Sequence, residues 1–392
     1  MRRFKIALVC DWYLPRVGGL ELHLFDLLRE LGARGHDAHL ICVTPGPHET
    51  DTAKVRRLAE PLMPRIKTIR DPKVMDRLER ILVEERFDIV HSHNSYSPFA
   101  HAGMYVANRL RMPSVFTEHS VLRGYGVNLF GALDRVFGWT RWPTVLTGVS
   151  RYIAEDLRQV SGRDDALVLW NGVRPSSWTV RRVDGHPPRV IHVGRFFFRK
   201  QQADLVRAIP RILKRLPRER WPRFTFVGDG PQRPRVERLA KRLGVAEHVE
   251  FAGLRSRAEI RELFASSTVF ALPSEKEALP ICVLEARSAG LPVVARAPNG
   301  VADLIAHGRE GFLAETADQF ADGIARIVGD RALWSSMHEH STRGLDRFTW
   351  DQVIDRHENV YTLATQRAAG QTEILLDRCA NVIADDARRK IA

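Results

Sequence analysis

Two glutamates, Glu277 and Glu285, have seven residues between them in the stretch SEKEALPICVLE. A strand-like apolar run (269–272) precedes this stretch, and a helix-like segment ending near Gly290 follows it. Glu277 is therefore predicted on a loop and Glu285 in the first turns of a helix. Amides at a helix N-terminus favour an anion, and carboxylates accept hydrogen bonds from hydroxyl groups. The pattern fits a ligand with both phosphates and hydroxyls, although an isolated pair of glutamates is more often two surface charges.

The composition is that of a soluble globular protein with two domains. The chain has 392 residues, of which 44% are hydrophobic and 27% charged. Its four cysteines lie far apart and form no C-x-x-C pair, which predicts reduced packing residues in a cytoplasmic protein. The start MRRFKIALVCDWYLP does not resemble a signal peptide, and no run is long enough to span a membrane.

The net charge of +13 calls for anionic partners such as nucleotide phosphates, an anionic membrane surface or nucleic acid. The basic residues are scattered and do not form one tract, so a generally arginine-rich composition explains the charge equally well. Nucleic-acid binding rests on charge alone, and we do not expect it.

The first half reads as strands followed by helices, beginning with a strand at 5–10, a helix from Gly19 and a strand at 38–43. The pair Gly18-Gly19 permits a tight turn or a close approach to a ligand, but the chain lacks G-x-G-x-x-G.

Polar residues end two further strands of this half: His91 and His93 end one, and His119 follows another. Ligands of open α/β sheets collect beyond strand carboxyl ends, so these side chains are candidate cleft residues. The two histidines of H-S-H share a strand face, but no third residue has the spacing of a metal ligand.

The second half repeats the pattern from a strand at 189–193 onwards. Gly194, Arg195 and Lys200 follow this strand and precede a helix at 203–215. An arginine and a lysine in this position can neutralise a diphosphate.

These repeats predict an α/β fold with two Rossmann-like, parallel-sheet domains. We expect an N-terminal acceptor domain at 1–178, completed by a C-terminal helix in 350–392, and a C-terminal donor domain at 186–348. The glycine-rich and basic loops of both domains would then face an interdomain cleft.

The order and spacing of several motifs resemble glycosyltransferase family 4, whose members are retaining enzymes of the GT-B fold. The motifs are Gly18-Gly19-Leu20-Glu21, Gly194-Arg195 with Lys200, Gly228-Asp229-Gly230-Pro231, Phe251-Ala252-Gly253 and Glu277-x7-Glu285. The resemblance covers roughly residues 4 to 366. The stretch HSHNSYSPFAHAGMYVANRLRMPSVFTEHS is most similar to the catalytic subunit of the GPI-anchor N-acetylglucosaminyltransferase. The chain also resembles phosphatidylinositol mannosyltransferases and the N-acetylglucosaminyltransferases of small-thiol biosynthesis.

The resemblance implies a role for each matching residue. Arg195 and Lys200 would hold the donor diphosphate, Glu285 the ribose and Glu277 the transferred sugar, while His119 would lie near that sugar. The implied catalytic residues are His119, Glu277, Arg195 and Lys200. The implied donor-binding residues are Gly19, Gly194, Arg195, Lys200, Gly253, Leu254, Glu277, Ala278, Leu279, Pro280, Ile281 and Glu285. The acceptor candidates are Glu21, His93, Asn94 and Tyr125. Because Pro280 has no N–H, phosphate contacts in that loop should come from neighbouring amides.

The resemblance also implies the reaction. UDP-N-acetylglucosamine is the first choice of donor, with GDP-mannose and UDP-glucose open. The acceptor would be a hydroxyl of a lipid, a cyclitol or another small molecule, with possible peripheral contact to an anionic membrane. No D-x-D motif is present, so we expect neither a metal nor a cofactor. A nucleotide-sugar 2-epimerase and a catalytically dead binding protein are the alternatives.

Overall fold

The computed structural model describes residues 2–46, 51, 53–58, 72–94, 96–123, 130–132, 134–135, 138–183 and 187–370. The chain divides into two compact units. Unit 1 comprises Met1–Val149, Ala154–Leu169 and Ile354–Ala392, and unit 2 comprises Ser150–Ile153 and Trp170–Val353. Each unit is described by itself below.

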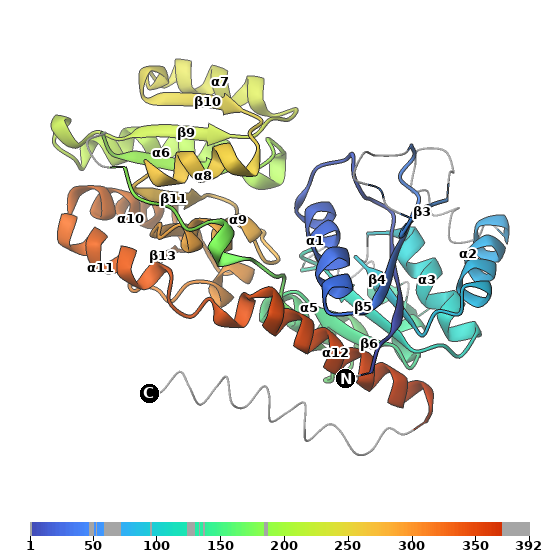
Figure 1. The fold of residues 1–392 in the computed structure, drawn as a ribbon. Helices are drawn as coiled ribbons and strands as arrows, with labels where there is room; N and C mark the ends of the chain where they lie inside the picture. Colours follow the sequence, from blue (N-terminus) through green and yellow to red (C-terminus); the bar gives the residue numbers. More distant parts are fainter. Residues whose placement is uncertain are drawn as a thin grey trace. The chain divides into compact units, whose positions relative to one another are not determined.

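The described part of unit 1 is built on a seven-stranded parallel sheet with the strand order β3-β2-β1-β4-β5-β6-β7 (Figure 1). The order reverses between β1 and β4, where Leu8 pairs with His91. Such a reversal leaves a crevice at the carboxyl ends of the two strands. The strands are β1 Lys5–Cys10, β2 Asp37–Cys42, β3 Val55–Arg57, β4 Ile89–His93, β5 Ser114–Glu118, β6 Val145–Gly148 and β7 Leu167–Val168.

Helices cover both faces of this sheet, because its strands are apolar on both sides. Val9 packs in one apolar cluster with Leu78 and Phe99, on the face covered by α2 and α3. On the other face, His91 bonds to Tyr361 of α12. The helices are α1 Gly19–Ala33, α2 Pro72–Glu84, α3 Pro98–Arg109, α5 Arg151–Ser161 and α12 Trp350–Ala368, and a 3₁₀ turn spans Trp139–Arg141.

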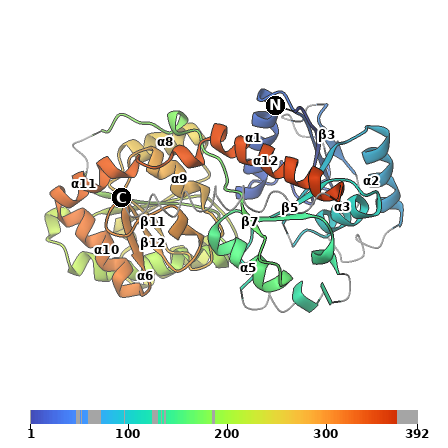
Figure 2. The same cartoon turned by 90° about the horizontal axis from the view of Figure 1, so that it is seen from below.

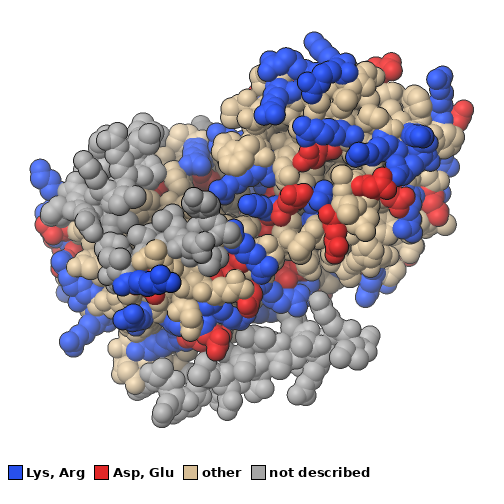
Figure 3. Space-filling model, turned by 180° about the vertical axis from the view of Figure 1, so that it is seen from behind, with Lys and Arg blue, Asp and Glu red and all other residues tan. Residues whose placement is uncertain are grey.

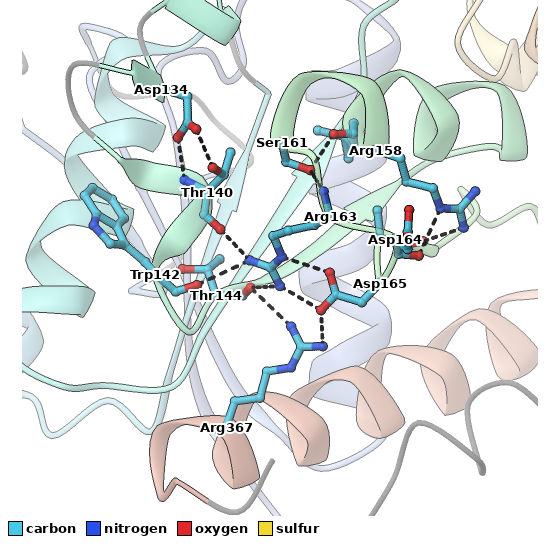
Figure 4. A network of polar contacts seen from close by, with 12 residues as sticks. Asp134, Thr140, Trp142, Thr144, Arg158, Ser161, Arg163, Asp164, Asp165 and Arg367 are labelled. Carbon is cyan, nitrogen blue, oxygen red and sulfur yellow. Dashed lines mark hydrogen bonds and ion pairs between the residues drawn. The ribbon is translucent and has the colours of Figure 1, made fainter. Parts of the chain in front are cut away.

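Helix α12 is held to unit 1 near its middle and at its C-terminal end. Figure 2 shows α12 passing α1, and the His36 ring, just after α1, lies 3.0 Å from an oxygen of Glu358 in the middle of α12. At the C-terminal end of α12, Arg367 lies 2.6 Å from an oxygen of Asp165, which Arg163 also binds (Figure 4). Arg163 further donates to backbone carbonyls in the segment before β6, so one partly buried network joins α12 to the edge of the sheet.

The described part of unit 2 has a six-stranded parallel sheet with the order β10-β9-β8-β11-β12-β13. This order reverses between β8 and β11. The strands are β8 Arg189–Val193, β9 Arg223–Val227, β10 Val249–Gly253, β11 Val269–Leu272, β12 Val293–Arg296 and β13 Gly311–Ala314. The helices are α6 Gln202–Lys214, α7 Arg233–Arg242, α8 Arg257–Ala265, α9 Ile281–Ser288, α10 Ala317–Gly329 and α11 Arg331–Ser341. The prediction of two parallel, Rossmann-like sheets is therefore confirmed.

Two surface properties bear on partners. Figure 3 shows Lys and Arg side chains spread over the visible face and interleaved with Asp and Glu. No helix in the described ranges has both the length and the apolar character needed to cross a membrane.

Candidate functional site

An ion pair lies where the strand order of unit 2 reverses. Lys200 follows β8 and Glu277 follows β11, and the Lys200 Nζ is 2.9 Å and 3.0 Å from the two Glu277 carboxylate oxygens. The Glu277 side chain is 7% exposed and the Lys200 side chain 35%. Water therefore reaches the ammonium group more easily than the carboxylate.

Close backbone packing brings Lys200 to this place. After β8, the amide of Phe196 donates to the Asp229 carbonyl over 2.9 Å, which fixes the loop against the turn after β9. Gly228 has a φ of +127°, and a Cβ there would lie 2.3 Å from the Gly194 carbonyl oxygen. Only glycine fits this approach, so Gly228-Asp229-Gly230 supports the loop that carries Lys200.

The loop that carries Glu277 rests on a second glycine. The amide of Gly300 donates to the Glu277 carbonyl over 2.8 Å. A Cβ on Gly300 would lie 1.6 Å from the Ala278 oxygen. Asn299 Nδ2 donates to the Ser274 carbonyl over 3.2 Å. The turn before the 3₁₀ segment Gly300–Asp303 therefore holds the loop in place.

The ion pair keeps Lys200 charged. Burial favours the neutral amine, but the charge and hydrogen bond of Glu277 outweigh it, and the pKa of Lys200 is raised. Burial also raises the pKa of the nearby Cys282 thiol to about 12. The negative charges of Glu277 and Glu285 raise this pKa further, and the positive charge of Lys200 lowers it. The thiol is therefore neutral at pH 7, and Glu285 lies three residues further along α9.

The other predicted donor-binding residues lie at the same edge of the sheet or directly beyond it. Gly194 follows β8, and Arg195 is exposed with its guanidinium 6.0 Å from the Phe197 ring. Gly253 ends β10 and accepts a hydrogen bond from the Gly228 amide, while Leu254 is 73% exposed. The segment from Glu277 to α9 holds the rest: Ala278 and Leu279 are buried, Pro280 precedes the helix and Ile281 begins it.

In unit 1 the glycine pair opens α1. Gly18 precedes the helix, and a Cβ on it would lie 2.4 Å from a Glu21 carboxylate oxygen. A Cβ on Gly19 would meet no atom within 4 Å, so its backbone faces open space. Glu21 is buried and paired with Arg16 over 3.0 Å, so part of its hydrogen-bonding capacity is already used.

His93 and His119 are in direct contact. The His93 Nδ1 and the His119 Nε2 are 3.1 Å apart, and the His23 ring of α1 lies 5.4 Å from the His119 ring. The His91 ring stacks on His93 at 4.1 Å and lies 5.8 Å from His357 of α12. Five imidazoles therefore lie close together on the face of the sheet that α1 and α12 cover.

His23, His91, His93 and His119 are neutral at pH 7 because burial lowers their pKa values. Burial, with a smaller effect of His357, lowers the pKa of His119 to about 3. Burial also holds the pKa values of His23, His91 and His93 well below their usual range. The rings do not converge on one point, since no three His, Cys, Asp or Glu side chains of the described chain are placed to hold a metal ion.

The ring nitrogens of His91 and His93 differ in their hydrogen-bond partners. Both nitrogens of His91 have partners, Thr117 Oγ1 at 2.7 Å and the Tyr361 hydroxyl at 3.0 Å. The buried His93 Nε2 has no partner among the described residues. Next to it, Asn94 adopts a φ of +77° and accepts a hydrogen bond from Ser120. Tyr125 lies outside the described residues.

The sequence analysis missed Asp11, which directly follows β1 in the run LVCD. Its Oδ2 accepts hydrogen bonds from the Ser97 hydroxyl and, over 3.0 Å, from the Phe99 amide. Burial raises its pKa to about 7 against these hydrogen bonds. An acid directly after an apolar strand was the available signal, and the contacts show a cap on the first turn of α3.

The chain has relatives of known family over almost its whole length. An uncharacterised glycosyltransferase of Methanocaldococcus jannaschii is 27% identical, over 92% of this chain and 99% of the relative. The GPI3 subunit of the phosphatidylinositol N-acetylglucosaminyltransferase of Saccharomyces cerevisiae is 25% identical, over 98% and 88%. The N-acetyl-alpha-D-glucosaminyl L-malate synthase of Bacillus anthracis is 24% identical, over 92% and 97%.

The fold has solved counterparts as well. The Anabaena protein HepE, in a crystal structure with UDP-glucose, superimposes with a TM-score of 0.75 at 20% identity and covers 92% of this chain and 100% of its own. Residues 17–177 match Glycosyltransferase Family 4, and residues 178–343 match Glycosyl transferases group 1. The chain therefore belongs to the glycosyltransferases of the GT-B fold, with a family 4 domain followed by a group 1 domain.

Proposed function

We propose that this glycosyltransferase is a retaining hexosyltransferase that moves N-acetylglucosamine from UDP-N-acetylglucosamine to a hydroxyl group. The observation that carries the proposal is the Lys200–Glu277 pair at the strand reversal of the group 1 domain. Two of the relatives above are named for N-acetylglucosamine, which favours this donor over UDP-glucose or GDP-mannose.

In this proposal unit 2 binds the donor. Lys200 and the exposed Arg195 neutralise the diphosphate as it leaves, which is the main electrostatic requirement of the reaction. Glu277 accepts hydrogen bonds from the sugar hydroxyls, Glu285 binds the ribose, and the backbone near Leu254 meets the base. Since Lys200 is cationic before the donor arrives, no proton uptake is needed for binding.

Unit 1 supplies the remaining groups. The open Gly19 amide would contact phosphate, and His119 would bind a hydroxyl of the donor sugar. Because the pKa of His119 is lowered to about 3, its ring is a neutral hydrogen-bonding partner at pH 7 and not a general acid. Glu21, His93 and Asn94 are the described acceptor candidates, for a lipid, cyclitol or other small acceptor.

The proposed reaction needs no metal and no cofactor, because side-chain cations and amides stabilise the leaving group. Attack from the leaving-group face, with the donor phosphate as base, would retain the anomeric configuration. Activity should therefore be unchanged by EDTA or added Mg²⁺, and nuclear magnetic resonance of the product should show an α-linkage. We also propose a cytoplasmic protein with peripheral contact to anionic membranes.

The test is a screen of UDP-N-acetylglucosamine, UDP-glucose and GDP-mannose against lipid, cyclitol and malate-like acceptors, read by mass spectrometry. Lys200→Ala should abolish transfer. Lys241→Ala, which removes the same charge from an exposed position in the last turn of α7, should not. Acceptor-dependent release of UDP supports the proposal. Turnover of the donor without acceptor would instead indicate an epimerase, and donor binding without turnover a binding protein.

A further inference from the structure

A cavity of about 220 Å³ lies at the end of the unit 2 sheet opposite to Lys200 and Glu277. Its walls include residues that precede strands: Pro188 before β8, Arg220 before β9 and Thr268 before β11. The ion pair follows the carboxyl ends of β8 and β11. A five-residue strand is about 17 Å long, so the cavity is separate from the proposed donor site.

Three arginines line this cavity, and two of them lie against one tryptophan. The guanidinium carbons of Arg182 and Arg331 are each 4.4 Å from the ring centre of Trp334. Trp334 is buried, and its indole N–H donates to the Thr268 carbonyl over 2.9 Å. Arg182 also donates to the Ser267 carbonyl, so part of its hydrogen-bonding capacity is already used. A guanidinium that rests on a ring, as that of Arg331 does, can keep N–H groups at its edge available to an oxyanion.

None of the described residues that line the cavity is acidic, and three of them are arginines. Asp330 precedes Arg331 in the chain, but its Oδ1 caps α11 by accepting from the amides of Ala332 and Leu333 at 2.9 Å and 3.0 Å. A fourth cation, Arg189, donates to the hydroxyl of Ser266 in the wall over 2.8 Å.

Within the described ranges, neither Arg220 nor Arg331 forms an ion pair with a carboxylate. Like charges gathered at a half-enclosed site repel one another, and a bound anion would remove this repulsion. The two guanidiniums of Arg220 and Arg331 match a dianion better than a single carboxylate. A phosphate monoester carries about −1.5 to −2 charges and three acceptor oxygens at pH 7.

We propose that this cavity, which we name the arginine pocket (Arg182, Arg220, Arg331 and Trp334), binds a phosphate monoester or pyrophosphate group at the same time as unit 2 holds a nucleotide. The volume accommodates the phosphate and a short organic fragment, since a water molecule occupies roughly 30 Å³ of the liquid. The phosphate could belong to a soluble metabolite or to a lipid headgroup, and the chemistry recognised is the same.

The test measures binding of inorganic phosphate and glycerol phosphate by titration calorimetry at constant ionic strength. The protein carries Lys200→Ala, so that the proposed donor site does not contribute. Arg220→Gln/Arg331→Gln changes two exposed side chains of the arginine pocket. Arg238→Gln/Arg261→Gln removes the same charge from exposed positions on α7 and α8. We expect at least tenfold weaker binding in the pocket variant and less than a twofold change in the control.

A second arm uses vesicles of phosphatidylcholine with and without phosphatidic acid. If only the acidic vesicles bind, and only with the pocket intact, the phosphate is that of a lipid. Equal losses in both double variants, or no binding of any probe, would overturn the proposal. Matching circular dichroism spectra and melting temperatures of the variants exclude misfolding. None of these measurements uses transferase activity, so their outcome is independent of the proposed function.

Discussion

Replacing the two members of the Lys200–Glu277 pair should have unequal effects on stability. Lys200→Met leaves a carboxylate whose side chain is only 7% exposed without its cation. Removing one partner of a fully buried pair costs about 3–5 kcal/mol. Because Lys200 is 35% exposed and water reaches the pair, we expect a smaller loss, about 1–3 kcal/mol in the free energy of unfolding. Glu277→Gln leaves an ammonium group that can turn to water, and should cost less than about 1 kcal/mol.

The double variant Lys200→Met/Glu277→Gln removes the stranded charge, so its loss should be smaller than the sum of the two single losses by about 1 kcal/mol. The assay is urea unfolding of the four proteins at pH 7, followed by tryptophan fluorescence and circular dichroism.

The same comparison at lower pH checks the cause. The penalty in Lys200→Met comes from a buried carboxylate without its cation, and protonation of the carboxylate would remove the uncompensated charge. The penalty is then present at pH 7 and disappears as the pH falls toward about 4.3, the usual value for glutamate. Equal losses in the two single variants, additivity in the double variant, or a penalty that persists at low pH would show that the pair does not act as a buried charge and its counter-ion.

Three further predictions concern the supporting structure. Gly300→Ala places a Cβ 1.6 Å from the Ala278 oxygen, so it should lower the free energy of unfolding by about 2 kcal/mol and abolish most donor binding. Urea unfolding measures the first effect and titration calorimetry the second. As a control, the Cβ of Gly32→Ala in α1 meets no atom within 4 Å, so this variant should be neutral or stabilising. The histidine cluster should make the protein acid-labile, because the pKa values of its buried histidines are lowered in the folded state. As the pH falls below about 6.5, only the unfolded chain takes up protons at these histidines, so the melting temperature should drop. The drop should be less steep in His93→Gln, and an unchanged slope in this variant would contradict the prediction. If His93 orients His119, His93→Ala should lower kcat/KM about tenfold with little change in donor affinity. His93→Gln should restore part of the lost kcat/KM, because its amide can reach the His119 Nε2 that His93 contacts. The ¹⁵N spectrum of the His119 ring should show a changed tautomer in the alanine variant only.

The rule that ligand-binding residues follow parallel strands allowed the position of the Lys200–Glu277 pair in unit 2 to be predicted. The strand predicted at 189–193 has these bounds in the structure, and Lys200 and Glu277 meet because β8 and β11 are neighbours. Two elements of unit 1 were not predicted. Helix α5 carries four charged residues in its eleven, although Ile153 and Leu157 have helical spacing, and β3 has only three residues.

The histidine cluster shows where local sequence patterns stop being informative. His91 and His93 share a strand face, which the alternation of a strand predicts. His357 of α12 contacts His91, and His23 of α1 contacts His119. A C-terminal helix was predicted to complete this domain, but nothing in the local sequence indicates that it and α1 bring their histidines to the same face of the sheet. The H-S-H motif predicted polar residues at a cleft rather than metal ligands. Burial by α1 and α12 leaves the His119 ring neutral, because desolvation lowers its pKa to about 3. In the proposed function, the hydrogen bond between His93 and His119 then sets which nitrogen of His119 meets a substrate hydroxyl.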